Sequence, residues 1–206
     1  MPALPTPDPT LLAGGPSGPR ALRPLVETVL AALEEGAAAR CGPLPGGGPG
    51  AVTRRLLARC GPALPAQGTG AHDALRSVVS ALAEGAADPA DPHCAAHLHA
   101  PPLAVAAAAD LAAAALNPSM DSWDQAPAAS ALELHLTAAL ACLVHPGGRA
   151  PDALVTTGGT EANLLGLLLA RERFGPRLVT VCGANAHHSV RRAAWLLGLP
   201  APTVLL

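Results

Sequence analysis

Apolar residues near the N-terminus recur at the spacing of an amphipathic helix. Over residues 23–39, one side of the predicted helix is apolar and the other side carries most of the glutamates. The apolar positions are Leu25, Val26, Val29, Leu30 and Leu33, and the acidic ones are Glu27, Glu34 and Glu35. The same spacing predicts a second helix over 72–86 and a short one over 52–60. Neither long helix has an adequate apolar partner within its own segment, so we expect both to pack on a larger body or on a partner chain.

The pattern changes after residue 150. Before it, helical spacing predicts helices over 103–116, which follows two prolines, and over 128–144. After it, short apolar runs alternate with helical stretches. They predict strands and helices in the order strand 153–157, helix 161–173, strand 177–182, helix 188–197 and strand 203–206. Such alternation is typical of parallel strands with right-handed crossovers and of ligands at the carboxyl ends of the strands. The sequence therefore predicts an α/β fold with candidate ligand loops at 156–160 and 183–188.

Proline and glycine mark the predicted segment boundaries. Residues 1–19 are rich in both and are predicted to be a disordered tail, while residues 41–50 form a flexible linker. We divide the chain into the tail at 1–19, a helical segment at 20–92 and an α/β segment at 93–206. Half of the residues are hydrophobic but only 1% are aromatic, which predicts a core of small side chains.

Charge and cysteine content limit the possible binding partners and the cellular compartment of the protein. A net charge of −2 gives no electrostatic support for binding nucleic acid or an anionic membrane. The five cysteines are scattered, form no CxxC pair and are odd in number, which indicates reduced thiols. The apolar stretch at 103–116 contains Asp110 and is too short to span a bilayer. With no secretory leader recognisable, these features predict a cytoplasmic protein.

The most informative stretch is LVTTGGTEAN at 154–163, which predicts a strand, a glycine turn and a helix start. Gly158 and Gly159 permit backbone angles and close approaches that a side chain would block. Thr160 suits the N-cap position, and Glu161 falls in the first turn, where the helix dipole favours a carboxylate. The free N–H groups of such a turn form an anion site, typically for a phosphate, although a tight connection alone would have the same sequence. The chain contains no lysine and no G-x-G-x-x-G motif, so neither a P-loop nor a dinucleotide fingerprint is present.

Histidines and one tryptophan are the other candidates for chemistry. The cluster at 93–99 (His93, Cys94, His97, His99) does not have a zinc-binding spacing, so we expect a structural or substrate-contact role and no metal. Trp123 is either a buried anchor or the wall of a pocket. His187 and His188 follow a predicted strand at the ligand face; one of them points into the cleft, or both are surface histidines.

Four blocks in the second half of the chain together resemble a known family. HLHAPP, ALNPSMDSWDQAPA, TTGGTEANLLGLLLAR and NAHHSVRRAAWLLGL are similar, in this order, to blocks of the group II pyridoxal phosphate-dependent amino acid decarboxylases. That family includes the aromatic amino acid, glutamate, histidine and 2,4-diaminobutyrate decarboxylases. The residues of the four blocks are most similar to those of bacterial diaminobutyrate-type members. The resemblance covers roughly residues 93–206. It implies the N-terminal part of the aminotransferase-like (type I) fold, in which helices precede a parallel-sheet large domain, here cut short.

The resemblance also implies roles for individual residues. The turn at Gly158, Gly159 and Thr160 would hold the phosphate of pyridoxal 5'-phosphate, which agrees with the anion site expected from the helix start. His187 would stack on the pyridine ring of the cofactor and is the predicted catalytic residue. The substrate pocket would be lined by His97, His99 and Trp123. The segment at 20–92 would interlock with a second subunit in a homodimer.

The implied reaction is the decarboxylation of an L-amino acid, with 2,4-diaminobutyrate as the first candidate substrate. It needs a lysine for the Schiff base and a carboxylate beside the pyridinium nitrogen. In the family both follow the part that this chain resembles, and the chain has no lysine at all. We therefore expect a fragment that is inactive by itself. The alternative is a non-catalytic module that dimerises or binds a ligand.

Overall fold

The structure, a computed structural model, describes residues 11–95, 99–147 and 151–206. It separates into two compact units, Met1–Pro118 and Ser119–Leu206, each considered by itself. The boundary between the two compact units therefore lies between residues 118 and 119, whereas the sequence predicted a domain boundary between residues 92 and 93. The division into a dimerisation segment and a cofactor domain remains a prediction, since compactness does not test it.

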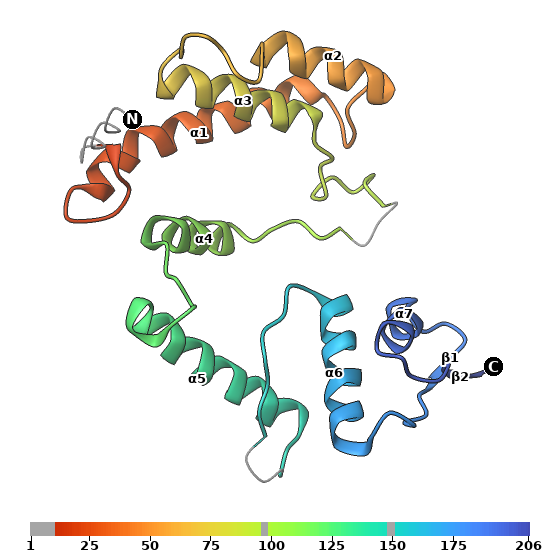
Figure 1. The fold of residues 1–206 in the computed structure, drawn as a ribbon. Helices are drawn as coiled ribbons and strands as arrows, with labels where there is room; N and C mark the ends of the chain where they lie inside the picture. The colour runs from red at the N-terminus through yellow and green to blue at the C-terminus, as the bar shows by residue number, and fades with distance from the viewer. Residues whose placement is uncertain (1–10, 96–98, 148–150) are drawn as a thin grey trace. The chain divides into compact units, whose positions relative to one another are not determined.

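The first unit is made of helices (Figure 1). They are α1 (Gly18–Arg40), α2 (Gly48–Cys60), α3 (Ala71–Gly85) and α4 (Ala104–Leu116). Each lies within a few residues of the helix that the apolar spacing predicts. The largest difference is at α1, which begins at Gly18, inside the segment predicted to be a tail, with a proline in its first turn. Proline suits that position because its fixed φ is helical and its missing N–H would have no helical partner there.

Helices α1 and α3 pack side by side, with α2 against α3. At the contact, a Cβ on Gly36 of α1 would lie 2.3 Å from the carbonyl oxygen of Ser80 on α3, so glycine is needed for this approach. Arg76 of α3 pairs with Glu35 of α1 and lowers the pKa of that carboxyl. The expectation that neither helix has a partner within its own segment is wrong, because periodicity cannot show that two helices 30 residues apart will meet.

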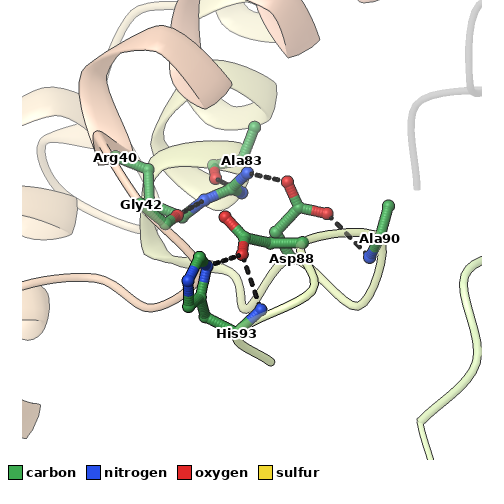
Figure 2. Close-up of polar contacts among 7 residues, drawn as sticks. Arg40, Gly42, Ala83, Asp88, Ala90 and His93 are labelled. Carbon is green, nitrogen blue, oxygen red and sulfur yellow. Dashed lines mark hydrogen bonds and ion pairs between the residues drawn. The ribbon is translucent and has the colours of Figure 1, made fainter. Parts of the chain in front are cut away.

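Polar contacts connect the C-terminal ends of α1 and α3 (Figure 2). The Arg40 guanidinium donates to the carbonyl oxygen of Gly42 at 2.8 Å, to that of Ala83 at 3.0 Å and to the Asp88 carboxylate at 2.8 Å. In the loop that follows, Asp91 accepts hydrogen bonds from the backbone and the ring of His93, which lower the pKa of its carboxyl. Arg40 therefore joins the C-terminal ends of α1 and α3 to the loop after α3.

The second unit combines helices with a small parallel sheet. It contains the short 3-10 helix η2 (Trp123–Gln125), α5 (Pro127–Val144), α6 (Gly159–Phe174), β1 (Val181–Gly183), α7 (Ser189–Leu196) and β2 (Thr203–Leu205). Strands β1 and β2 pair in parallel, with Cys182 opposite Val204, and α7 forms the connection between them. The predicted parallel β-α-β arrangement is thus confirmed for this part of the chain.

Two predicted strands differ from the structure. Residues 153–157 form no strand, and the strand expected at 177–182 is reduced to the three residues of β1. A strand requires a hydrogen-bonded neighbour, and in the described residues β1 pairs only with β2. Segment 153–157 lacks such a neighbour, so its apolar side chains Leu154 and Val155 remain exposed.

The core is small and consists mostly of alanine. The buried apolar residues of the described chain are Ala32, Ala81, Ala126, Ala141, Ala193, Ala194 and Leu199. Helix α5 is apolar, with a mean hydropathy of 1.5, and is long enough to cross a membrane, although only 11% of it is buried. One such helix is weak support for a membrane span, because core helices of larger domains meet the same test. Glu133 and His135 lie at its centre, where a bilayer would penalise them.

Candidate functional site

The N-terminus of α6 is the first component of the site. The helix begins at Gly159, directly after Gly158, and its first intrahelical-type bond runs from the Ala162 N–H to the Gly158 carbonyl at 3.0 Å. The N–H groups of Gly159, Thr160 and Glu161 therefore precede any helical acceptor. Among the described residues, no hydrogen bond outside the helices uses them. This turn thus presents donors at the positive end of the helix dipole.

The sequence assigned the capping role to the wrong residue. Thr160 lies inside the first turn, Gly158 is the N-cap, and no side chain caps the helix end directly. Glu161 instead reaches back: its carboxylate accepts from the Thr157 N–H at 2.7 Å and from the Thr157 hydroxyl at 2.5 Å. These two bonds lower the pKa of Glu161, so its carboxylate is charged at neutral pH. The helix starts two residues earlier than a threonine cap would allow, since the glycines let the chain turn there.

The turn has room for a phosphate group. A Cβ built on Gly158 or on Gly159 would meet no atom within 4 Å, so the space beside both glycines is open. Three unused amide donors and the exposed Thr160 hydroxyl suit an anion with several acceptor oxygens. The charged Glu161 carboxylate is the one unfavourable neighbour, and it is engaged by Thr157 on the side before the helix. The residues present therefore fit the phosphate of a cofactor.

The loop between β1 and α7 supplies the second component. His187 Nδ1 lies 2.8 Å from the Ser189 hydroxyl and accepts the Ser189 backbone N–H at 3.3 Å. The Ser189 hydroxyl also accepts a hydrogen bond from the Asn163 side-chain amide on α6, at 2.8 Å. The His187 ring lies against that of His188, with centroids 4.1 Å apart and planes tilted by 40°. His187 is therefore tied through Ser189 to the early part of α6.

The same two helices are joined at their other ends, where Arg171 donates to the Leu197 carbonyl at 3.2 Å. Helices α6 and α7 therefore run side by side in the same direction, and their N-termini lie at one end. The two loops that the sequence proposed as ligand loops meet at this end, because Asn163 follows the first and Ser189 follows the second.

The other predicted site residues belong to other parts of the chain. His97 lies outside the described residues. His99 is exposed and belongs to the first unit, whereas Trp123 belongs to the second and is 70% exposed, so it is not a buried anchor there. The described residues contain no group of three or more His, Cys, Asp or Glu side chains that could hold a metal ion. The five cysteines are unpaired thiols.

Sequence analysis missed Asn163 and Ser189. Both lie within the blocks that carry the family resemblance, and a serine directly before a helical run is a usual helix-start signal. Nothing in the sequence indicates that they touch, because they are 26 positions apart.

The sequence also did not predict an apolar groove of about 340 Å³ between residues 152–156 and α6, which is lined by Leu154, Leu165 and Leu169 among others. This groove contains none of the predicted site residues.

The chain is similar in sequence to a known family and to proteins that belong to it. The model of the pyridoxal-dependent decarboxylase conserved domain matches residues 55–204. An L-2,4-diaminobutyrate decarboxylase of Rhizobium meliloti (strain 1021) is 37% identical over 146 residues, covering 69% of this chain and 29% of that protein. A second L-2,4-diaminobutyrate decarboxylase, of Acinetobacter baumannii, is 32% identical over 164 residues, covering 68% of this chain and 32% of that protein. The chain thus spans about a third of the length of these relatives.

A solved structure agrees with the sequence comparisons. The glutamate decarboxylase domain of diaminobutyrate-pyruvate transaminase and L-2,4-diaminobutyrate decarboxylase from Vibrio parahaemolyticus matches with a TM-score of 0.81 and 29% identity. The match covers 94% of this chain and 46% of that one. The architecture is therefore that of the N-terminal part of a pyridoxal phosphate decarboxylase domain. With a family model that matches most of its length, the chain belongs to the pyridoxal-dependent decarboxylase family.

Proposed function

We propose that this chain is the phosphate-binding part of a pyridoxal phosphate-dependent L-amino acid decarboxylase. The observation that carries the proposal is the shared end of α6 and α7. There, the open glycine turn at Gly158 and Gly159 and the loop that holds His187 are tied together through Asn163 and Ser189. Family membership gives this end its ligand class.

In the proposed site, the first amides of α6 and the Thr160 hydroxyl bind the cofactor phosphate. His187 lies beside the pyridine ring and keeps water from one face of it. When bound, pyridoxal phosphate acts as an electron sink that accepts the electron pair released as carbon dioxide leaves an amino acid. The chain's own contribution is to bind and orient the cofactor.

The substrate is proposed from the relatives. Both curated relatives are L-2,4-diaminobutyrate decarboxylases, so we propose 2,4-diaminobutyrate as the amino acid. His97, His99 and Trp123 are the proposed substrate-pocket residues. We further propose a cytoplasmic homodimer whose subunits meet through the segment at 20–92, without nucleic acid or membrane as a partner.

The absence of lysine bears on activity. Without a lysine this chain cannot form the Schiff base that holds the cofactor, so we expect it to release no carbon dioxide from 2,4-diaminobutyrate. This same feature favours the second candidate, a non-catalytic module that dimerises or binds a ligand. Release of carbon dioxide by the purified chain above a no-protein blank would contradict the expected inactivity.

Titration with pyridoxal phosphate, followed by cofactor fluorescence, tests the binding proposal. We expect weak and reversible binding, with a Kd of about 0.1–1 mM, because phosphate contacts and ring stacking act without a covalent link. Thr160→Ala should weaken binding through loss of the hydroxyl, and His187→Ala through loss of ring contact. Inorganic phosphate should compete.

Two controls isolate the site. Pyridoxal without its phosphate should bind much more weakly, and His145→Ala, an exposed histidine at the end of α5, should bind like the parent chain. No binding of pyridoxal phosphate at millimolar concentration would overturn the proposal. Equal loss in His145→Ala and His187→Ala would show that binding is not at this site.

A further inference from the structure

The hydrogen bonds around His187 have a defined direction. The Ser189 backbone N–H can only donate, and it points to His187 Nδ1 at 3.3 Å. A ring nitrogen that accepts a hydrogen bond carries no proton, so a neutral His187 ring carries its proton on Nε2. The direction of the remaining bonds follows from this one.

With Nδ1 as an acceptor, the Ser189 hydroxyl must donate its proton to it across 2.8 Å. The hydroxyl oxygen is then free to accept, and the Asn163 side-chain N–H donates to it at 2.8 Å. All three contacts are consistent with one direction of donation: the Asn163 amide donates to the Ser189 hydroxyl, and the Ser189 hydroxyl donates to the His187 ring. Because Ser189 is only 1% exposed, water cannot easily replace either partner.

We propose that Asn163 and Ser189 are positioning residues that fix His187 as the Nε2–H tautomer and set the plane of its ring. In this proposal each residue acts through His187, the residue that would meet the pyridine ring. The inference deepens the proposed function and rests on it, since the purpose of a fixed His187 ring is to meet the pyridine ring in one orientation. It adds two residues to the site that α6 and the β1–α7 loop supply.

The tautomer is measurable without any cofactor. In protein labelled with ¹⁵N on histidine, two-bond ¹H–¹⁵N spectra at about pH 8.5, above the usual titration range of histidine, distinguish Nδ1–H from Nε2–H. The His187 signal is identified by its loss in His187→Asn. We expect the Nε2–H form in the parent chain and a larger population of the Nδ1–H form in Ser189→Ala, which loses the 2.8 Å hydroxyl contact and keeps only the longer backbone donor to Nδ1 at 3.3 Å. A parent chain with mixed tautomers, or no change in Ser189→Ala, would overturn the proposal.

Asn163→Asp provides a sharper test because it reverses the direction of the bonds. A carboxylate can only accept, so the Ser189 hydroxyl would donate to it and the Nδ1–H form of His187 should gain population. Asn185→Asp is the matched control: it adds the same charge in the loop before His187, outside the three contacts. Circular dichroism and amide spectra show whether each variant is folded. An equal effect of both aspartates would contradict a specific path through Ser189.

A second readout separates this inference from the proposed function. In the fluorescence titration with pyridoxal phosphate, Ser189→Ala and Asn163→Asp should each bind roughly 3- to 10-fold more weakly, the loss expected for one oriented hydrogen bond, while Asn185→Asp stays unchanged. If the parent chain binds no pyridoxal phosphate but shows the fixed tautomer, the proposed function fails and the positioning of His187 stands. If the parent binds and the tautomer variants bind equally well, the positioning role is wrong.

Discussion

Arg40 shows how much one side chain fixes in this chain. Its side chain is 9% exposed and makes three hydrogen bonds, two to backbone carbonyls and one to the Asp88 carboxylate. The planar guanidinium can reach all three because its donors lie in a fixed fork. Asp88 is itself held in the loop, since its backbone N–H donates to the Pro43 carbonyl at 2.8 Å. Arg40 therefore secures the C-terminal ends of α1 and α3 and the loop that follows α3.

We expect Arg40→Ala to lower the free energy of unfolding by roughly 2–3 kcal/mol. The change leaves the Ala83 carbonyl and the Asp88 carboxylate without their donor, and unsatisfied groups carry a desolvation penalty. Urea unfolding followed by far-ultraviolet circular dichroism measures it. Arg40→Lys should recover only part of the loss, because an ammonium group cannot reproduce the fork.

Arg54→Ala is the matched control for Arg40. Arg54 lies exposed on α2 and makes no hydrogen bond among those of the described residues, so its loss should change stability by less than about 0.5 kcal/mol. Equal effects of the two alanine variants would show that the Arg40 contacts do not stabilise the first unit.

At the scale of an element, the start of α6 is held by a side chain from within the helix. The Glu161 carboxylate accepts both donors of Thr157, and this contact fixes the chain just before the glycine turn. Glu161 is the acidic residue of the first turn, so this contact engages the negative charge nearest to the free amides in sequence. The conformation of the proposed phosphate site therefore depends on the charge state of Glu161.

This dependence gives a pH effect with a definite sign. The folded pKa of Glu161 is lowered from its ordinary value of 4.5 by the two Thr157 bonds. The stabilisation is therefore fully present above that value and is lost as the pH falls through the lower, folded pKa. Amide hydrogen exchange of Thr157 should speed up over this acidic range, beyond the intrinsic effect of pH.

Glu161→Gln tests the same contact at neutral pH. The neutral amide is a weaker acceptor, so the Thr157 amide should exchange faster than in the parent and show no acid transition of its own. Glu172→Gln, an exposed glutamate near the end of the same helix, is the control and should leave Thr157 unchanged. A Thr157 amide equally protected in the parent and in Glu161→Gln would contradict the assigned contact.

At the scale of the whole molecule, apolar surface is the dominant feature. Leu30 and Leu33 of α1 are 56% and 45% exposed even though α1 packs against α3. Helices α4 and α5 expose leucines and valines along their length, and the buried apolar residues of the described chain are nearly all alanine. Exposed apolar area of this kind favours association, because burying it releases ordered water and lowers the free energy.

We therefore predict that the purified chain is a dimer or larger, measured by multi-angle light scattering. Replacing Leu30 and Leu33 by serine should shift it toward the monomer, since both lie on the segment proposed to meet the partner subunit. Leu64→Ser removes a leucine that is 93% exposed in the loop after α2 and should leave the mass unchanged. A well-behaved monomer whose mass does not respond to the Leu30 and Leu33 changes would refute the association proposed through α1.

The fold and the site differ in how far the sequence predicts them. Helical spacing predicted seven helices close to their observed bounds, and the Gly158–Gly159 turn before α6 was located correctly. The predicted strand at 153–157 was wrong. An apolar, β-branched run favours the extended conformation, but it forms a strand only when a neighbouring strand supplies hydrogen bonds. Thr160 was wrong as a cap because the helix begins at the glycines before it.

The sequence by itself determined the local elements and the family of this protein. Periodicity and turn residues act over a few positions, and the ordered blocks identified the cofactor class before any contact was visible. Only the tertiary structure decided that α1 pairs with α3, that Arg40 joins their ends, and that Asn163 reaches Ser189 and His187. The hydrogen bonds from Arg40 to Ala83 and from Asn163 to Ser189 join residues 43 and 26 positions apart. Such contacts depend on packing and chain direction, which no local pattern of side chains specifies.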